Sequence, residues 1–157
     1  MAKPLFIVAG IASIIAALSF ILVWDIIVLP WTGPALNAIA ATVMAAALVI
    51  KLIGYYVLAD KEKLRFLKIM SVILLVAVVL ARLSGLELLT HPLLIFYGIA
   101  LLTLRTKWAM AAGILNIVTG IASPIAFVLW DFAPIWLTAW PLSQLAESIV
   151  LFLAAKK

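Results

Sequence analysis

The stretch SQLAESIVLFLAAKK, residues 143–157, sets one carboxylate into an otherwise apolar segment at the end of the chain. Glu147 stands nine residues before Lys156, so in a membrane-spanning helix it would lie well below the membrane surface. A lone ionised carboxylate in hydrocarbon costs about 2.5 kcal/mol or more and takes up a proton unless it has a partner. The stretch therefore predicts a transmembrane helix and, inside the protein, a polar contact for Glu147.

The composition of the whole chain agrees with a membrane protein. Hydrophobic residues make up 69% of it and charged residues 11%, whereas a soluble domain has about 45–50% and about 25%. A chain of 157 residues has room for about six or seven helices of about 20 residues each, and for no separate soluble domain. We therefore expect an all-α integral membrane protein with a single transmembrane domain over residues 1–157.

Six apolar runs separated by short polar turns predict a compact bundle of six transmembrane helices. The runs cover approximately residues 4–29, 35–58, 64–83, 86–104, 108–130 and 135–155. The first run is too long for a signal peptide and no small-residue cleavage pattern follows it, so we expect it to be retained. The fourth is barely long enough to cross a bilayer, and His91 and Pro92 interrupt its start.

Lysine and arginine residues predict the orientation of the bundle. Six crossings place both ends of the chain and every second loop on one side, and only Arg82 falls on the other. The residues on the first side are Lys3, Lys61, Lys63, Arg65, Lys68, Arg105, Lys107, Lys156 and Lys157. By the positive-inside rule, both termini of this multi-pass protein are expected in the cytoplasm and the helices in the cell membrane. The cations are spread along the membrane rim, which favours contact with lipid headgroups over nucleic acid.

A layer of polar side chains is expected inside the bundle. Counting about 1.5 Å per residue from the cytoplasmic helix ends places Lys51, Asn116 and Glu147 at a depth of about 12 Å. Ser13, Ser71 and Tyr97 fall within about a turn of this level, and Gln144 shares one side of the sixth helix with Glu147. The fifth helix also carries a stripe of small and polar residues suited to close packing: Ala109, Ala112, Asn116, Thr119, Gly120 and Ser123. Each helix thus contributes a polar group, and the second, fifth and sixth should meet at this level.

Lys51 is the expected partner of Glu147, because it carries the opposite charge at the same depth. The pair is open to two interpretations: a functional site, with Asn116, Gln144 and Tyr97 as further ligand-binding residues, or a structural pin between two helices. A further alternative is that the two residues do not pair: Lys51 then reaches the cytoplasmic headgroups and Glu147 has no partner.

A second group of polar residues is expected at the external boundary. Asp25 and Asp131 each follow a tryptophan, Trp24 and Trp130. The tryptophans are typical of an interfacial aromatic belt; alternatively, they and the two aspartates form a mouth that receives a cationic ligand. Glu87 and His91 lie four residues apart and could share a helix face. Two ligands are too few for a metal site, however.

The two ends of the chain share short sequences. GIAS occurs at residues 10–13 and 120–123, and WD at residues 24–25 and 130–131. The likeness is open to two interpretations: a parallel repeat of the first two helices in the last two, as occurs in transporters, or chance similarity in a chain rich in a few apolar residues.

No catalytic, phosphate-binding or zinc-binding motif is present, and no cofactor is expected. The sequence favours a small membrane protein that binds or transports a small molecule or ion through the polar layer. The alternative is a non-catalytic structural subunit of a larger membrane complex. Expected partners are the lipid bilayer, the small ligand, and a further copy or other subunits; nucleic acid is not expected. In size and helix number the chain resembles the six-helix substrate-binding components of vitamin transporters, which implies substrate binding and a separate energising module.

Overall fold

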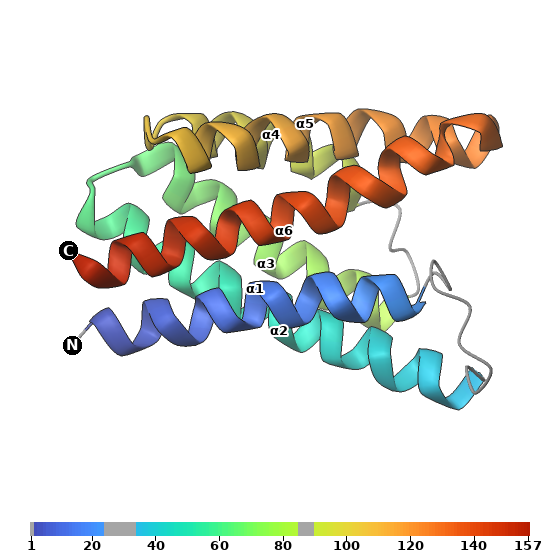
Figure 1. Ribbon diagram of the computed structural model, residues 1–157, viewed down its shortest axis with the longest axis horizontal. Coiled ribbons are helices and arrows are strands. Elements are labelled where there is room, and N and C mark those ends of the chain that lie inside the picture. The colour runs from blue at the N-terminus through green and yellow to red at the C-terminus, as the bar shows by residue number, and fades with distance from the viewer. Residues whose placement is uncertain (1, 24–33, 85–89) are drawn as a thin grey trace.

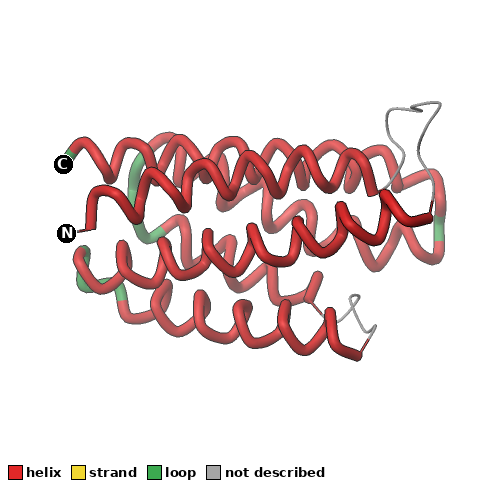
Figure 2. The backbone as a smooth tube through the Cα atoms, turned by 90° about the horizontal axis from the view of Figure 1, so that it is seen from below, coloured by secondary structure: helices red, strands yellow, loops and turns green. Residues whose placement is uncertain are grey.

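The computed structural model describes residues 2–23, 34–84 and 90–157, and the regular structure within them is helical. The elements are α1 (Ala2–Val23), α2 (Pro34–Lys61), α3 (Arg65–Ser84), α4 (Thr90–Leu102), α5 (Lys107–Val128), the short 3-10 helix η2 (Trp130–Phe132) and α6 (Ala133–Lys156). The helices lie lengthwise beside one another (Figures 1 and 2). Both chain ends lie at the same end, as expected for an even number of helices (Figure 1).

The six α-helices form a closed ring. Each helix packs against the next one along the chain, and α6 packs against α1 (Figure 1). Side chains that point inward from different helices therefore meet in the middle of the ring. This arrangement brings residues from both ends of the sequence into one site.

Five helices are long and apolar enough to cross a membrane: α1, α2, α3, α5 and α6. Helix α4 has 13 residues, fewer than the roughly 20 that a crossing needs. α4 ends at Leu102, two residues before the approximate end of the helix predicted over residues 86–104, and Arg105 adopts a positive φ of 53° in the turn that follows. Residues 86–89 lie outside the described part of the chain, as do residues 24–29 of the first predicted helix.

The outer surface of the bundle is strongly apolar. Large side chains are exposed on different helices, for example Leu18 by 57%, Ile39 by 59% and Leu80 by 58%. Contiguous apolar surface of this kind is unusual on a soluble protein and suits contact with lipid tails. The interior, in contrast, holds many small residues and a set of buried polar ones.

Small residues allow the helices to approach closely, most of all between α4 and α5. A Cβ atom built on Gly98 would lie 2.5 Å from the carbonyl oxygen of Gly113, and one built on Gly113 would lie 2.7 Å from the carbonyl oxygen of Gly98. Such contact between backbones is typical of helix association in membranes, where apolar side chains gain nothing by leaving lipid. The predicted small and polar stripe of α5 is buried along its whole length, from Ala109 to Ser123.

Candidate functional site

The carboxylate of Glu147 on α6 is the centre of a buried polar cluster. Its Oε2 atom lies 3.1 Å from Nζ of Lys51 on α2 and accepts a hydrogen bond of 3.0 Å from the hydroxyl of Tyr97 on α4. Its Oε1 atom accepts a hydrogen bond of 2.9 Å from Nδ2 of Asn116 on α5. Side chains from three helices thus supply one opposite charge and hydrogen-bond donors to a carboxylate that has no access to water.

Lys51 connects Glu147 to a second polar group on α6. Its Nζ atom donates a hydrogen bond of 2.8 Å to Oε1 of Gln144, and it lies 5.6 Å from the centre of the Tyr97 ring. An ammonium group has three N–H donors. Gln144 and Glu147 accept two of them, and no described residue accepts the third.

Two further hydroxyl groups bind the backbone of α6 beside the cluster. Ser13 on α1 donates to the carbonyl oxygen of Gln144 at 2.7 Å, and Tyr55 on α2 donates to that of Glu147 at 3.1 Å. Sequence analysis missed Tyr55. It follows Lys51 by four residues, so the shared helix face was a signal that could have found it.

The prediction that Lys51 is the partner of Glu147 is confirmed, and the alternative in which Lys51 reaches the headgroups is wrong. Lys51 is 1% exposed, and Asn116, Gln144, Glu147 and Tyr97 are fully buried. The five residues predicted as a site in the bundle therefore do lie together.

The polar residue predicted for α3 at this level, Ser71, is not bonded to the cluster. The hydroxyl of Ser71 is buried there, but it donates to the carbonyl oxygen of Leu67 in its own helix at 2.8 Å. A serine in a helix readily forms such a bond to the preceding turn, and depth alone does not reveal it.

The Asn116 amide is only partly satisfied. Its Nδ2 atom donates to Glu147 and also, at 2.9 Å, to the carbonyl oxygen of Ala112. Both neighbours are acceptors, which explains why the amino group faces them. The Oδ1 atom of Asn116 is buried and has no hydrogen-bond partner among the described residues.

A cavity of about 290 Å³ extends from this cluster toward the end of the bundle that lies opposite the termini. Lys51 and Gln144 line its inner end, and Arg82, Thr90 and His91 line its outer end. Lys51 touches the space only at its edge, because its side chain is just 2% exposed. The cavity therefore joins the rim of the bundle to the buried ion pair.

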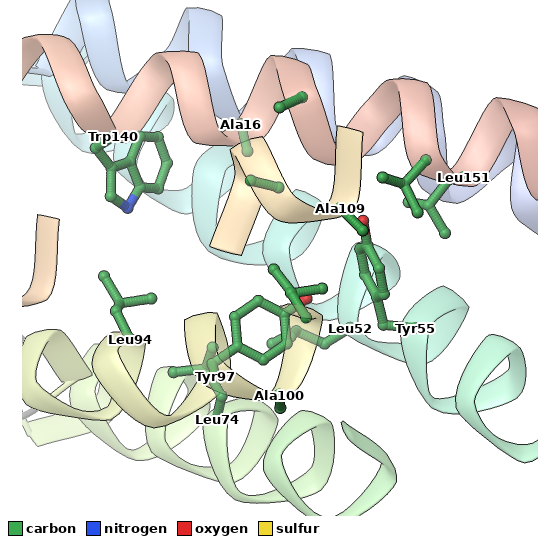
Figure 3. Packing of buried hydrophobic residues seen from close by; sticks show 14 of the residues in the cluster. Ala16, Leu52, Tyr55, Leu74, Leu94, Tyr97, Ala100, Ala109, Trp140 and Leu151 are labelled. Carbon is green, nitrogen blue, oxygen red and sulfur yellow. The ribbon is translucent and has the colours of Figure 1, made fainter. Parts of the chain in front are cut away.

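Aromatic side chains form one wall of the cavity. The Phe20 ring is stacked on Trp140 with a centroid distance of 4.3 Å, and it meets Trp136 edge-on at 5.7 Å. The His91 ring lies 5.7 Å from Trp136. Figure 3 shows Tyr97 and Tyr55 amid the buried side chains, with Trp140 and Leu94 to one side of them and Leu151 to the other.

Of the residues predicted at the external boundary, His91 lines the outer end of the cavity. Asp131 is exposed in η2 and does not line the cavity. Asp25, Trp24 and Glu87 lie outside the described residues, so the shared cation-binding mouth stays a prediction. Within residues 2–23, 34–84 and 90–157, no three His, Asp or Glu side chains gather as a metal site would require.

No protein family, curated protein or solved structure matches the chain. The geometry of the cluster is therefore the basis for inferring function. It holds a compensated ion pair, a lysine N–H without an acceptor and an adjoining cavity, which together suit the recognition of a small molecule.

Proposed function

We propose that this chain is a multi-pass membrane protein that binds a small molecule in the cavity beside the Lys51–Glu147 pair, either to hold it or to transport it. The five long apolar helices and the apolar outer surface support residence in a membrane. The polar cluster and the aromatic wall support binding of a molecule with both polar and apolar parts.

The cavity is the observation that carries this proposal. Protein interiors are close-packed, and few voids larger than a water molecule occur in them. A structural pin between helices needs no free space next to it, whereas ligand pockets begin at about 300 Å³ and combine apolar walls with a few polar groups. A volume of about 290 Å³, lined by Trp136 and Trp140 and ending at Lys51 and Gln144, fits the second description.

The orientation follows from the distribution of cations. We place both termini in the cytoplasm by the positive-inside rule, so the outer end of the cavity, near Arg82, faces the exterior. A cysteine introduced at Asp131 should react with an impermeant reagent added to intact cells, and one introduced at Lys156 should not. Reaction at Lys156 alone would reverse the orientation.

The test uses native mass spectrometry of the protein extracted from its own membrane. Ala45 lines the cavity, whereas Ala46 is exposed on the outside of the same helix. We expect a small molecule to be retained by the unaltered protein and by Ala46→Trp, and to be lost in Ala45→Trp, whose indole would occupy the cavity.

The competing function is that of a non-catalytic subunit in a larger membrane complex. Its signature in the same experiment is a stable assembly with other chains and no bound small molecule. A retained molecule that survives Ala45→Trp would also contradict the proposal, because it would lie outside the cavity.

A further inference from the structure

A second cavity lies at the end of the bundle that carries the termini. It has a volume of about 400 Å³ and lies among the ends of α2 and α6 and the turn between α4 and α5. Leu58, Val150 and Ala154 are buried residues of its lining, whereas Glu62 and Lys156 are exposed where it meets the surface. The bundle is thus hollowed from both ends, by this second cavity and by the first cavity of about 290 Å³ described above.

A short length of the bundle separates the two cavities. On α6, the first cavity reaches Gln144 and the second reaches Val150, which are roughly 9 Å apart along the helix at about 1.5 Å per residue. On α2, Leu52 and Leu58 line the first and the second cavity and have the same separation. The hydrocarbon core of a bilayer is about 30 Å thick. The sealed part of the ring is therefore much thinner than the membrane.

Three buried side chains close the ring between the cavities: Tyr55, Tyr97 and Glu147, which we call the plug. Along the chain, each stands between a residue that lines the first cavity and one that lines the second. All three are 0% exposed, and the two tyrosine rings meet edge-on with a centroid distance of 6.0 Å. In Figure 3 the rings lie between Leu94, which lines the first cavity, and Leu151.

The contacts of the plug cross the ring and join helices that are not neighbours in it. Helix α1 lies between α2 and α6, and α5 lies between α4 and α6. Yet Lys51 on α2 and Tyr97 on α4 both reach the Glu147 carboxylate on α6, at 3.1 and 3.0 Å. Such side-chain contacts can separate and form again while each helix stays intact and packed on its neighbours. A structural pin explains these contacts, but it does not explain a cavity on each side of them.

Space on both sides of a thin polar layer is typical of transport proteins, in which a central gate separates the two sides of the membrane. Ionisable residues within the membrane also mark substrate pathways. If the chain binds a small molecule in the first cavity, as proposed above, we infer that it transports this molecule through the middle of the ring. The plug is the gate: when the Lys51–Glu147 contact separates, the two cavities join and the molecule passes between them.

Cysteine labelling tests the two cavities, because the chain contains no cysteine of its own. Ala45 lines the first cavity, Ala154 lines the second, and Ser148 is buried between them. The single variants Ala45→Cys, Ala154→Cys and Ser148→Cys are reconstituted in right-side-out and inside-out vesicles, and a cationic and an anionic impermeant methanethiosulfonate are added. We expect Ala45→Cys to react from one side, Ala154→Cys from the other, and Ser148→Cys much more slowly than both. Ala46→Cys, on the exposed outside of α2, should not react in lipid.

Removing the plug contacts should open the path. In Lys51→Ala with Glu147→Ala, the reagents should reach Ala45→Cys from the side of the second cavity. With the plug intact, this reaction should be roughly tenfold to a thousandfold slower, because a minor open state is about 0.1–10% populated. Vesicles with the double variant should also swell faster in erythritol, a small neutral solute, and adding Ala45→Trp should slow the swelling again. Tyr55→Phe with Tyr97→Phe keeps both rings and should accelerate the labelling by less. Thermal unfolding checks that each variant is folded.

The outcomes separate this inference from the proposed function. If Ala45→Cys with an intact plug is never labelled from the side of the second cavity, the gate does not open and the chain only holds its molecule. Labelling that is indifferent to the plug variants, or an Ala154→Cys that reacts from neither side, would also overturn the path. In these cases a native molecule that is lost in Ala45→Trp would leave the binding function in place. If no molecule is retained, the proposed function fails and this inference fails with it.

Discussion

The ring of helices encloses two regions of opposite character. Around Glu147, side chains from four helices are joined by hydrogen bonds of 2.8–3.1 Å and are nearly inaccessible. A few turns further from the termini, residues of α1, α2, α3, α4 and α6 line a cavity of about 290 Å³ with mostly apolar walls. The first region is rich in specific contacts and has little space, and the second has space and few polar contacts.

The difference shows which part of the interior holds the bundle together. In a membrane, apolar side chains gain little by leaving lipid, so helix association depends on close packing and on hydrogen bonds. The polar cluster and the glycine contacts between α4 and α5 provide both. The cavity walls provide neither to the same degree, so substitutions there should affect the fold much less than substitutions in the cluster.

Separating the ion pair should have the largest effect. Lys51→Met leaves the Glu147 carboxylate buried without a counter-charge. Glu147→Gln likewise leaves the Lys51 ammonium buried without a counter-charge. We expect either change to lower the free energy of unfolding by about 3–5 kcal/mol, measured by SDS titration in mixed micelles. Replacing both residues with apolar ones removes both charges and should cost much less than the sum of the single changes.

The two single variants and the double variant form a double-mutant cycle, which also tests whether Lys51 and Glu147 interact at all. Strictly additive effects would mean that the two groups do not stabilise each other, and the assignment of the cluster as the anchor of the bundle would fail. A folded double variant that keeps its bound molecule would leave the pair as a pin, next to a binding site that does not need it.

The second contrast sets the tight α4–α5 contact against the cavity wall. Gly98→Ala would place a Cβ atom 2.5 Å from the carbonyl oxygen of Gly113, so the two backbones must move apart, and we expect a loss of about 1–3 kcal/mol. Ala81→Leu adds a larger side chain, but Ala81 lines the cavity. Its effect on unfolding should be below about 1 kcal/mol. Equal losses in both variants would mean that the cavity is as tightly packed as the glycine contact.

The polar cluster could be predicted from the sequence, because membrane helices impose a simple geometry. A fixed rise per residue converts position in the chain into depth, and the scarcity of charged residues leaves Glu147 few candidate partners. Lys51, Asn116 and Tyr97 were found in this way, and Gln144 was found because it shares one face of its helix with Glu147.

The cavity could not be predicted in the same way. It depends on how far apart neighbouring helices settle, which side-chain volumes around the whole ring decide together. The apolar run that contains α4 is barely long enough to cross the membrane, and the turn after Leu102 ends the helix two residues before the expected end. Ser71 shows the remaining limit: depth indicates which residues share a level, but not whether a hydroxyl turns inward or bonds its own helix.

The smallest expected difference lies within the cluster, between two tyrosines whose hydroxyl groups both donate to Glu147. Tyr97 donates to the carboxylate at 3.0 Å, and Tyr55 donates to the backbone carbonyl at 3.1 Å. The backbone carbonyl lies within α6, so it can still accept the helical hydrogen bond from the backbone N–H four residues later when the Tyr55 hydroxyl is removed. The Glu147 carboxylate, in contrast, loses one of its hydrogen-bond donors when the Tyr97 hydroxyl is removed. We therefore expect Tyr97→Phe to lower the free energy of unfolding by about 1–2 kcal/mol and Tyr55→Phe by about 0.5–1 kcal/mol. Both variants retain the aromatic ring, so packing is matched and the same SDS titration isolates the hydroxyl. A larger loss in Tyr55→Phe would show that the attachment of α2 to the backbone of α6, and not the solvation of the Glu147 charge, is the main contribution of these hydroxyl groups to stability.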